Sequence, residues 1–579
     1  NLSRSHNHSS EQLNCFKAHN MLNLFDHINQ LHECELYQDL KQLACIALTL
    51  CDNSSSETEV LTLTQKYQTM VFCGNGHYQL AEYLKAEDLY LKALQLRKAI
   101  NKTKGKTTCP LQGNMELTSE VEVKYKVYQC LMRMKQHREA MTILEGISTK
   151  QRTAKINLAL ARLYIRAGMD RSAITSFKEV LRECPLALEA VHGLLSLGQK
   201  GTDVVTLVMS GMPHGTICDW LSNWIRGYAF LASHEYNHTI YSFKLLDTKT
   251  YLKDNIYLLA GLAQTHFLEG QYSQALIAFQ RAHARDPLHL SNMDMYAFLL
   301  YKDKKVQELQ RLSQQLMSVS EHAAEPWIAM GYLSLVTKKA VRAVYFAQKA
   351  NNINPCNVEA FLLKGTALLD IKKTQEAILH YQEALRVAPH RYEAYSGLIE
   401  CYLMSHRNRD ALSWSWKAIK TLGSSARTLT LYASVLGKDK GTVAKAKTYL
   451  ERAMSFDPTY LEPVYLMTEI LAQERQFEKG IDLLRKQLIN QSTCRLHQML
   501  ADFLTQTNEH QEALDHYNKA LGLDPSNIRA KEGIERVEKQ SDTGMDNSFD
   551  VEVEDMGSSD HEGFDFDDVE STWSDTEFS

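Results

Sequence analysis

The stretch VEAFLLKGTALLDIKKTQEAILHYQEALRVAPHR, residues 358–391, decides the fold of this chain. Gly365 and Ala377 are small, so two helices can approach each other closely at these positions, and Phe361 and Tyr381 fill the space around them. Pro389 follows the second helix and cannot extend it. One such helix pair leaves an apolar face uncovered, so neighbouring pairs must stack on it.

Six prolines show that this unit recurs, because their spacings are close to multiples of about 34 residues, the length of the tetratricopeptide repeat. They are Pro185, Pro287, Pro355, Pro389, Pro458 and Pro525. Small and aromatic residues keep the same register in seven units, and weaker units lie between them, one of them truncated near 188–214. We therefore predict an all-α tetratricopeptide-repeat solenoid, a right-handed superhelix of about 13 helix pairs.

The ends of the chain differ from its middle. Residues 22–51 are apolar at helical spacing and predict an opening helical hairpin, whereas 528–540 predict a closing helix with a polar outer face. Residues 101–119 predict an exposed loop between repeats. Residues 1–20 are polar and predict a disordered leader, and the tail 541–579 holds fourteen Asp or Glu with no Lys or Arg, which predicts a disordered acidic tail.

The sequence lacks the common motifs for nucleotide binding and for metal binding. The chain has no GxxxxGK[ST] and no HExxH, and its twelve Cys are scattered without a CxxC. We expect no enzyme activity, no cofactor, no metal and a reducing compartment. No apolar run approaches the ~20 residues of a membrane span, and the basic runs are too small for a nucleic-acid surface. We expect neither membrane nor nucleic acid as a partner.

In proteins built from this repeat, the first helix of each pair lines the groove, mostly through repeat positions 2, 5, 9 and 12, and a carboxylate clamp uses positions 5 and 9. These positions read Leu362/Thr366, Ser396/Glu400, Tyr465/Glu469 and Gln498/Asp502. The Lys, Asn and Arg that clamp the carboxylates of chaperone tails are missing there. Glu400, Glu469 and Asp502, with Gln498 beside them, favour a basic peptide, because carboxylates pair well with guanidinium groups. The alternative is ordinary solvated charge on the groove wall.

Several segments outside the repeat consensus resemble one family. They are EVEVKYKVYQCLMRMKQ (120–136), RECPLALEA (182–190), EHAAEPW (321–327), GLIECYL (397–403) and KTLGSSARTLTL (420–431), with the opening MLNLFDHI (21–28) and the acidic tail. Together they resemble the subunit 7 family of the anaphase-promoting complex, from residue 21 onward. The leader 1–20 and the linker 101–119 depart from it.

The resemblance implies a non-catalytic scaffold of a ubiquitin ligase that acts in mitosis, in nucleus and cytoplasm and on the spindle. It implies that the N-terminal repeats 21–253 form a homodimer, that the C-terminal repeats 254–540 complete the solenoid, and that subunit 3 and other repeat subunits are partners. Apolar residues of the N-terminal half agree with a dimer: Leu207, Val208, Met209, Trp220 and Trp224. The groove acids would suit a coactivator tail ending in Ile-Arg, which subunit 3 receives in that family. The alternative is a repeat adaptor of another assembly, linked to ciliary transport or to chaperones.

Overall fold

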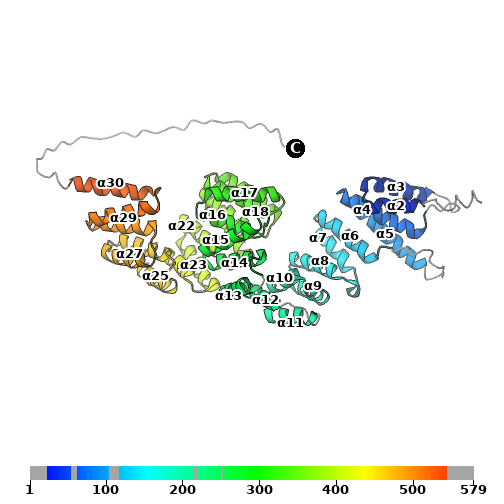
Figure 1. Cartoon of the computed structure of the whole chain (residues 1–579), viewed down its shortest axis with the longest axis horizontal. Helices are drawn as coiled ribbons and strands as arrows, with labels where there is room; N and C mark the ends of the chain where they lie inside the picture. Colours follow the sequence, from blue (N-terminus) through cyan, green and yellow to red (C-terminus); the bar gives the residue numbers. More distant parts are fainter. Residues whose placement is uncertain (1–22, 54–60, 104–116, 213–218, 250–251, 544–579) are drawn as a thin grey trace, which may run out of the picture. The chain divides into compact units, whose positions relative to one another are not determined.

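A computed structural model describes residues 23–53, 61–103, 117–212, 219–249 and 252–543 (Figure 1). In these ranges the chain forms α-helices and one 3-10 turn and contains no strand. The prediction of an all-α fold is therefore confirmed. The predicted leader lies outside the described residues, as does the predicted acidic tail from residue 544 onward. The predicted start of the disordered tail at residue 541 is wrong, because residues 541–543 belong to the last helix.

Thirteen helix–turn–helix units follow one another along the chain, as the repeat spacing predicts. They are α4 (Leu63–Gln79) and α5 (Tyr83–Thr103), α6 (Glu120–Arg133) and α7 (His137–Glu145), α8 (Ala154–Arg166) and α9 (Asp170–Glu183), α10 (Leu188–Ser196) and α11 (Gly201–Gly211), α12 (Asp219–Ala232) and α13 (Tyr236–Lys249), α14 (Ile256–Glu269) and α15 (Tyr272–Arg285), α16 (Met293–Lys302) and α17 (Val306–Val319), α18 (Ala324–Val336) and α19 (Ala340–Ile353), α20 (Val358–Asp370) and α21 (Thr374–Val387), α22 (Tyr392–Met404) and α23 (Asn408–Leu422), α24 (Ala426–Leu436) and α25 (Val443–Phe456), α26 (Glu462–Gln473) and α27 (Phe477–Asn490), and α28 (Cys494–Gln506) and α29 (His510–Leu523). The opening hairpin is α2 (Leu24–Glu33) and α3 (Tyr37–Asn53), and α30 (Ile528–Thr543) is the closing helix.

The predicted loop 101–119 begins too early. Helix α5 continues through Thr103, so residues 101–103 are helical, and 104–116 lie outside the described residues. Asn101 and Lys102 tolerate a helix end, and no proline precedes Pro110 to stop the helix sooner. Ser119 then caps α6, since its side chain accepts a hydrogen bond from the backbone N–H of Glu122 (3.1 Å).

The six periodic prolines occupy the same turn after a second helix. The residue before each proline leaves the helical conformation, as Asn354 (φ −129°, ψ 94°) and Asp457 (φ −143°, ψ 97°) do. Steric contact with the proline ring enforces this extended conformation. Where that residue is Asp or Asn, its side chain also closes the turn: Asp457 Oδ1 accepts from the N–H of Thr459 at 2.9 Å. The proline period therefore sets the ends of the second helices.

The turn inside twelve of the thirteen pairs uses a left-handed residue, which is glycine in only three of them, and the turn between α24 and α25 has none. Lys338, Lys372, His406, Arg475 and Asn508 all have φ between 55° and 66° at the equivalent position. Residues with a Cβ are uncommon in this conformation. The packing of the two helices, and not glycine freedom, holds this turn.

Glycines on the first helices allow close approach of an aromatic ring. At Gly74 a Cβ would lie 2.6 Å from Cε1 of Tyr90, and at Gly397 it would overlap the ring of Tyr381 and lie 2.7 Å from its hydroxyl. Both rings are almost fully buried. The predicted pairing of small residues with aromatic residues is thus the contact that joins α4 to α5 and α21 to α22.

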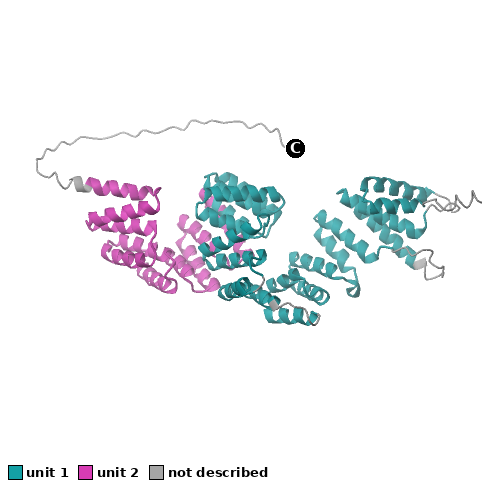
Figure 2. Ribbon diagram, viewed as in Figure 1, with its two compact units in different colours: residues 1–367 teal, residues 368–579 magenta. Residues whose placement is uncertain are grey.

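The chain divides into two compact units, residues 1–367 and 368–579 (Figure 2). Within each unit, consecutive helices pack on one another, and first helices also touch first helices, as α16 does α18 and α24 does α26. Buried apolar residues fill the space between these helices in several separate clusters. The functional division predicted at 253/254 concerns dimerisation and stays a prediction.

Candidate peptide-binding groove

Glu400 lies on the first helix α22 and is exposed. Nearby protein atoms nevertheless desolvate part of its carboxyl group, which raises the pKa of Glu400. The Asp370 carboxylate raises this pKa further. Desolvation also raises the pKa of Asp370. Two carboxylates that share a partly desolvated surface favour a cation between them.

Glu469 on α26 already faces a cation of the next repeat. Arg495, on α28, has Nη2 3.5 Å from Oε1 of Glu469, and both side chains are half exposed. The guanidinium of Arg495 also lies over the ring of Tyr465, 4.1 Å from its centroid. A partner's guanidinium would therefore compete with Arg495 for this carboxylate.

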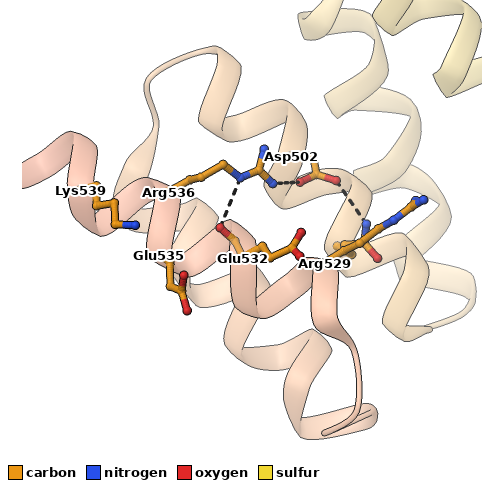
Figure 3. A pocket seen from close by; sticks show the side chains of 7 residues that line it. Asp502, Arg529, Glu532, Glu535, Arg536 and Lys539 are labelled. Atoms are coloured by element: carbon orange, nitrogen blue, oxygen red, sulfur yellow. Dashed lines mark hydrogen bonds and ion pairs between the residues drawn. The ribbon is translucent and has the colours of Figure 1, made fainter. Parts of the chain in front are cut away.

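Asp502 and Gln498 on α28 face the closing helix. Tyr517 donates a 2.5 Å hydrogen bond to Oδ1 of Asp502. Nη2 of Arg536 is 3.9 Å from the same oxygen, and Figure 3 shows this ion pair. Gln498 donates to Oδ2 at 3.4 Å, and its Oε1 accepts from Nδ2 of Asn527 at 3.2 Å.

A pocket of about 540 Å³ lies between α28 and α30. It is lined by Gln498, Asp502, Arg529, Glu532, Glu535, Arg536 and Lys539. Acidic and basic side chains are equal in number there, so the pocket has no dominant charge. Asp502 is thus less available to a basic peptide than its repeat position indicated.

A buried ionic network, which the sequence positions did not reveal, joins two first helices. The Glu393 carboxylate on α22 lies 2.9 Å from Nε of Arg391 and 3.2 Å from Nη2 of Arg427 on α24. The Arg391 side chain is 4 % exposed and the other two are 12 % exposed. The guanidinium of Arg427 also covers the ring of Tyr392, 3.8 Å from its centroid. This network fixes α22 against α24 and so positions the groove wall.

The structure places the four predicted groove residues on α22, α26 and α28. It brings Gln498 and Asp502 into contact, but no hydrogen bond or ion pair among the described residues joins Glu400, Glu469 and Asp502 to one another. They form three separate acidic points, on the first helices of three different repeats. An extended peptide with spaced cations would fit such points better than a single basic group.

Two imidazoles share one hydrogen bond between α28 and α29, the two helices of the last repeat. Nδ1 of His497 lies 2.9 Å from Nδ1 of His516, so one ring donates and the other accepts. Burial, followed by the Lys519 charge, lowers the pKa of both rings.

Acidification is therefore expected to destabilise this repeat. Both folded-state pKa values lie below the unfolded value of about 6.5, so the stabilisation is complete above that pH and is lost as the pH falls below it. The urea midpoint should fall between pH 7 and pH 5, and His516→Phe should make that fall shallower. An equal slope in the wild type and the variant would contradict this assignment.

Two further features bear on function. Among the described residues, no cluster of three or more His, Cys, Asp or Glu has the geometry to hold a metal ion. In the same ranges, no helix combines the length and apolar character needed to traverse a bilayer.

Comparison with known proteins identifies the family. The chain is 40 % identical over 549 residues to anaphase-promoting complex subunit 7 of Homo sapiens, covering 94 % of this chain and 96 % of the relative. The chain belongs to the anaphase-promoting complex subunit 7 family. The subunit 7 of Arabidopsis thaliana is 26 % identical over 533 residues, covering 89 % of this chain and 94 % of the relative.

The repeats of this subunit 7 family member match known repeats as well. The tetratricopeptide-repeat family matches residues 362–414, which include Glu400, and residues 495–527, which include Gln498 and Asp502. A solved structure described as the APC/C hetero-tetramer Cut9-Hcn1 is similar in fold, with a TM-score of 0.55 and 16 % identity. The match covers 89 % of this chain and 96 % of that one. The tetratricopeptide-repeat fold of the chain is therefore established.

Proposed function

We propose that this chain is a non-catalytic scaffold subunit of the anaphase-promoting complex, which supports assembly of the repeat subunits and recruitment of a coactivator. The observation that carries the proposal is the 40 % identity to human subunit 7 along 94 % of the chain. The thirteen helix pairs among the described residues support it, because stacked repeats present extended surfaces to other proteins. Its role is then to position partners, with ubiquitin transfer carried out by other subunits.

Homodimerisation through the N-terminal repeats belongs to this proposal. Of the residues that suggested an interface, Val208 and Trp224 are buried in the chain's own core and are not free to contact a partner. Helix α3 and the turn just before it offer a better surface, because Leu36 in that turn is 49 % exposed and Ile46 and Leu50 on the helix are 56 % and 48 % exposed. Apolar residues of this kind are typical of the centre of a homodimer interface.

Affinity purification of the full chain from dividing cells tests the proposed function. We expect the cullin and RING subunits of the ligase to be enriched together with subunit 3, and the tagged chain to be found in nucleus and cytoplasm and on the mitotic spindle. Recovery of ciliary-transport or chaperone partners in place of the ligase subunits would contradict the proposal.

The acidic groove points are proposed to bind a basic peptide such as a coactivator tail ending in Ile-Arg. Glu400→Lys combined with Glu469→Lys should weaken binding of such a peptide at least about tenfold, because two charge-assisted hydrogen bonds are lost. Fluorescence anisotropy with the full chain measures this. Glu376→Lys combined with Glu478→Lys, on the exposed second helices α21 and α27, is the matched control. Equal weakening by both pairs would show that only net charge matters.

A further inference from the structure

A second pocket lies among the N-terminal repeats. It has a volume of about 320 Å³ and is bounded by α2, α3, α4, α5 and α6. Its lining residues are His32, Tyr37, Asn75, Tyr78, Gln79, Tyr90, Lys126 and Gln129. These side chains are aromatic hydroxyls, amides, one imidazole and one ammonium, and none is a carboxylate.

Asn75 is held in one orientation at the base of this pocket. Its Oδ1 accepts hydrogen bonds from the Tyr90 hydroxyl and from Lys126 Nζ, both at 2.8 Å. Its Nδ2 lies 2.9 Å from Nε2 of His32, which therefore acts as the acceptor. Burial, and secondly the charge of Lys126, lowers the pKa of His32, in agreement with a neutral ring. The network fixes the Lys126 ammonium without neutralising it.

Lys126 forms no ion pair with a carboxylate among the described residues. Its hydrogen bond is to the neutral Asn75 amide, and an ammonium carries three donors, so two remain for the pocket. The negative charge of Glu122 raises the pKa of Lys126, but the Glu122 carboxylate forms its ion pair with Lys155, at 4.0 Å. Burial lowers the pKa of Lys126. A desolvated cation without a counter-ion destabilises the fold, and such charges are typical of binding sites.

We propose that this pocket binds a carboxylate of an acidic peptide segment, with the Lys126 ammonium as its counter-charge and Asn75 fixing that ammonium. One cation surrounded by neutral amides and hydroxyls suits a singly charged carboxylate, whereas a phosphate carries nearly two charges and favours arginine clusters. The tyrosine rings accommodate the apolar part of the segment.

An acidic segment could come from two sources. One is the tail of this chain, in which residues 541–579 contain fourteen acidic and no basic side chains. The other is an acidic segment of a partner protein. Both present the same carboxylate to Lys126, so the experiment has an arm for each.

Fluorescence anisotropy with a labelled peptide of residues 548–560, SFDVEVEDMGSSD, and the full chain tests the site. We expect binding that Lys126→Met weakens at least about tenfold, the loss of one charge-assisted hydrogen bond. Lys85→Met, at an exposed lysine, should change it less than twofold. The same peptide with Asn and Gln for its acids should not bind.

Thermal unfolding separates binding from a purely structural role. Because Lys126 forms no ion pair with a carboxylate that would offset its desolvation, Lys126→Met should leave the Tm unchanged or raise it. Gln129→Glu, which keeps Lys126 and supplies a carboxylate within the pocket, should also weaken the peptide. The proposal would be overturned if the wild type did not bind the peptide and Lys126→Met lowered the Tm. It would also be overturned if all variants bound the peptide equally.

A variant of the full chain with neutral Asn and Gln in the tail distinguishes the sources. Tighter peptide binding by this variant than by the wild type would support the tail as the occupant, because its acids no longer compete. Equal binding would support an acidic segment of another protein.

Discussion

Gly397→Leu is expected to destabilise residues 368–543 by about 3 kcal/mol, because it overpacks the contact between α21 and α22. A Cβ at this position already overlaps the Tyr381 ring, and the ring is 3 % exposed and has no room to move aside. The helices must separate to admit the new side chain. Urea unfolding followed by circular dichroism measures the loss.

Two variants control for other effects of this substitution. Gly522→Leu lies on α29 in open space, so it should be neutral or slightly stabilising through its better helix propensity. Tyr381→Ala combined with Gly397→Leu should recover part of the loss, since the leucine then fills the space left by the ring. If Gly397→Leu and Gly522→Leu unfold at the same urea concentration, the glycine–aromatic contact does not join the repeats.

Glu393→Ala is expected to cost about 3 kcal/mol, because it removes a carboxylate shared by two buried guanidiniums. Arg391 and Arg427 lie 2.9 and 3.2 Å from it and are 4 % and 12 % exposed. Their desolvation is then no longer offset by this charge. The effect should appear in the urea midpoint of the full chain.

Glu451→Ala on the exposed face of α25 is the matched control and should change the stability by less than about 0.5 kcal/mol. The stability of Glu393→Gln should lie between those of Glu393→Ala and Glu451→Ala, since glutamine keeps the shape of the side chain and loses its charge. A Glu393→Ala variant as stable as Glu451→Ala would show that water replaces the carboxylate freely.

The repeat frame could be predicted from the sequence because its physical determinants are local. Pro355 and Pro389 restrict the residue before them, so each helix end is set within a few residues. Gly397 and Tyr381 carry the packing signal in their sizes. The left-handed turns at Lys372 and Arg475 have no such signal, because no glycine marks them and helix packing imposes their conformation.

The groove could be predicted only in part, since its charges depend on pairs formed between repeats. Repeat position correctly placed Glu469 on a first helix, but it did not reveal that Arg495 of the next repeat would lie against it. Likewise Asp502 meets Arg536 of the closing helix. Position 2 of the first helix, where Arg495 lies, was the signal that could have found its pair with Glu469. Glu393 and Arg427 occupy the same position, whereas Arg536 of the closing helix does not.

Hydrogen exchange of the full chain, compared between the wild type and Gly397→Leu, tests most directly that each helix pair is stabilised by packing on its neighbours. Stacked repeats couple mainly to adjacent repeats. We predict faster exchange in α21, α22, α23 and α24 and unchanged exchange in α4 to α9. A uniform increase along the whole chain, or no increase in α21 and α22, would contradict the account.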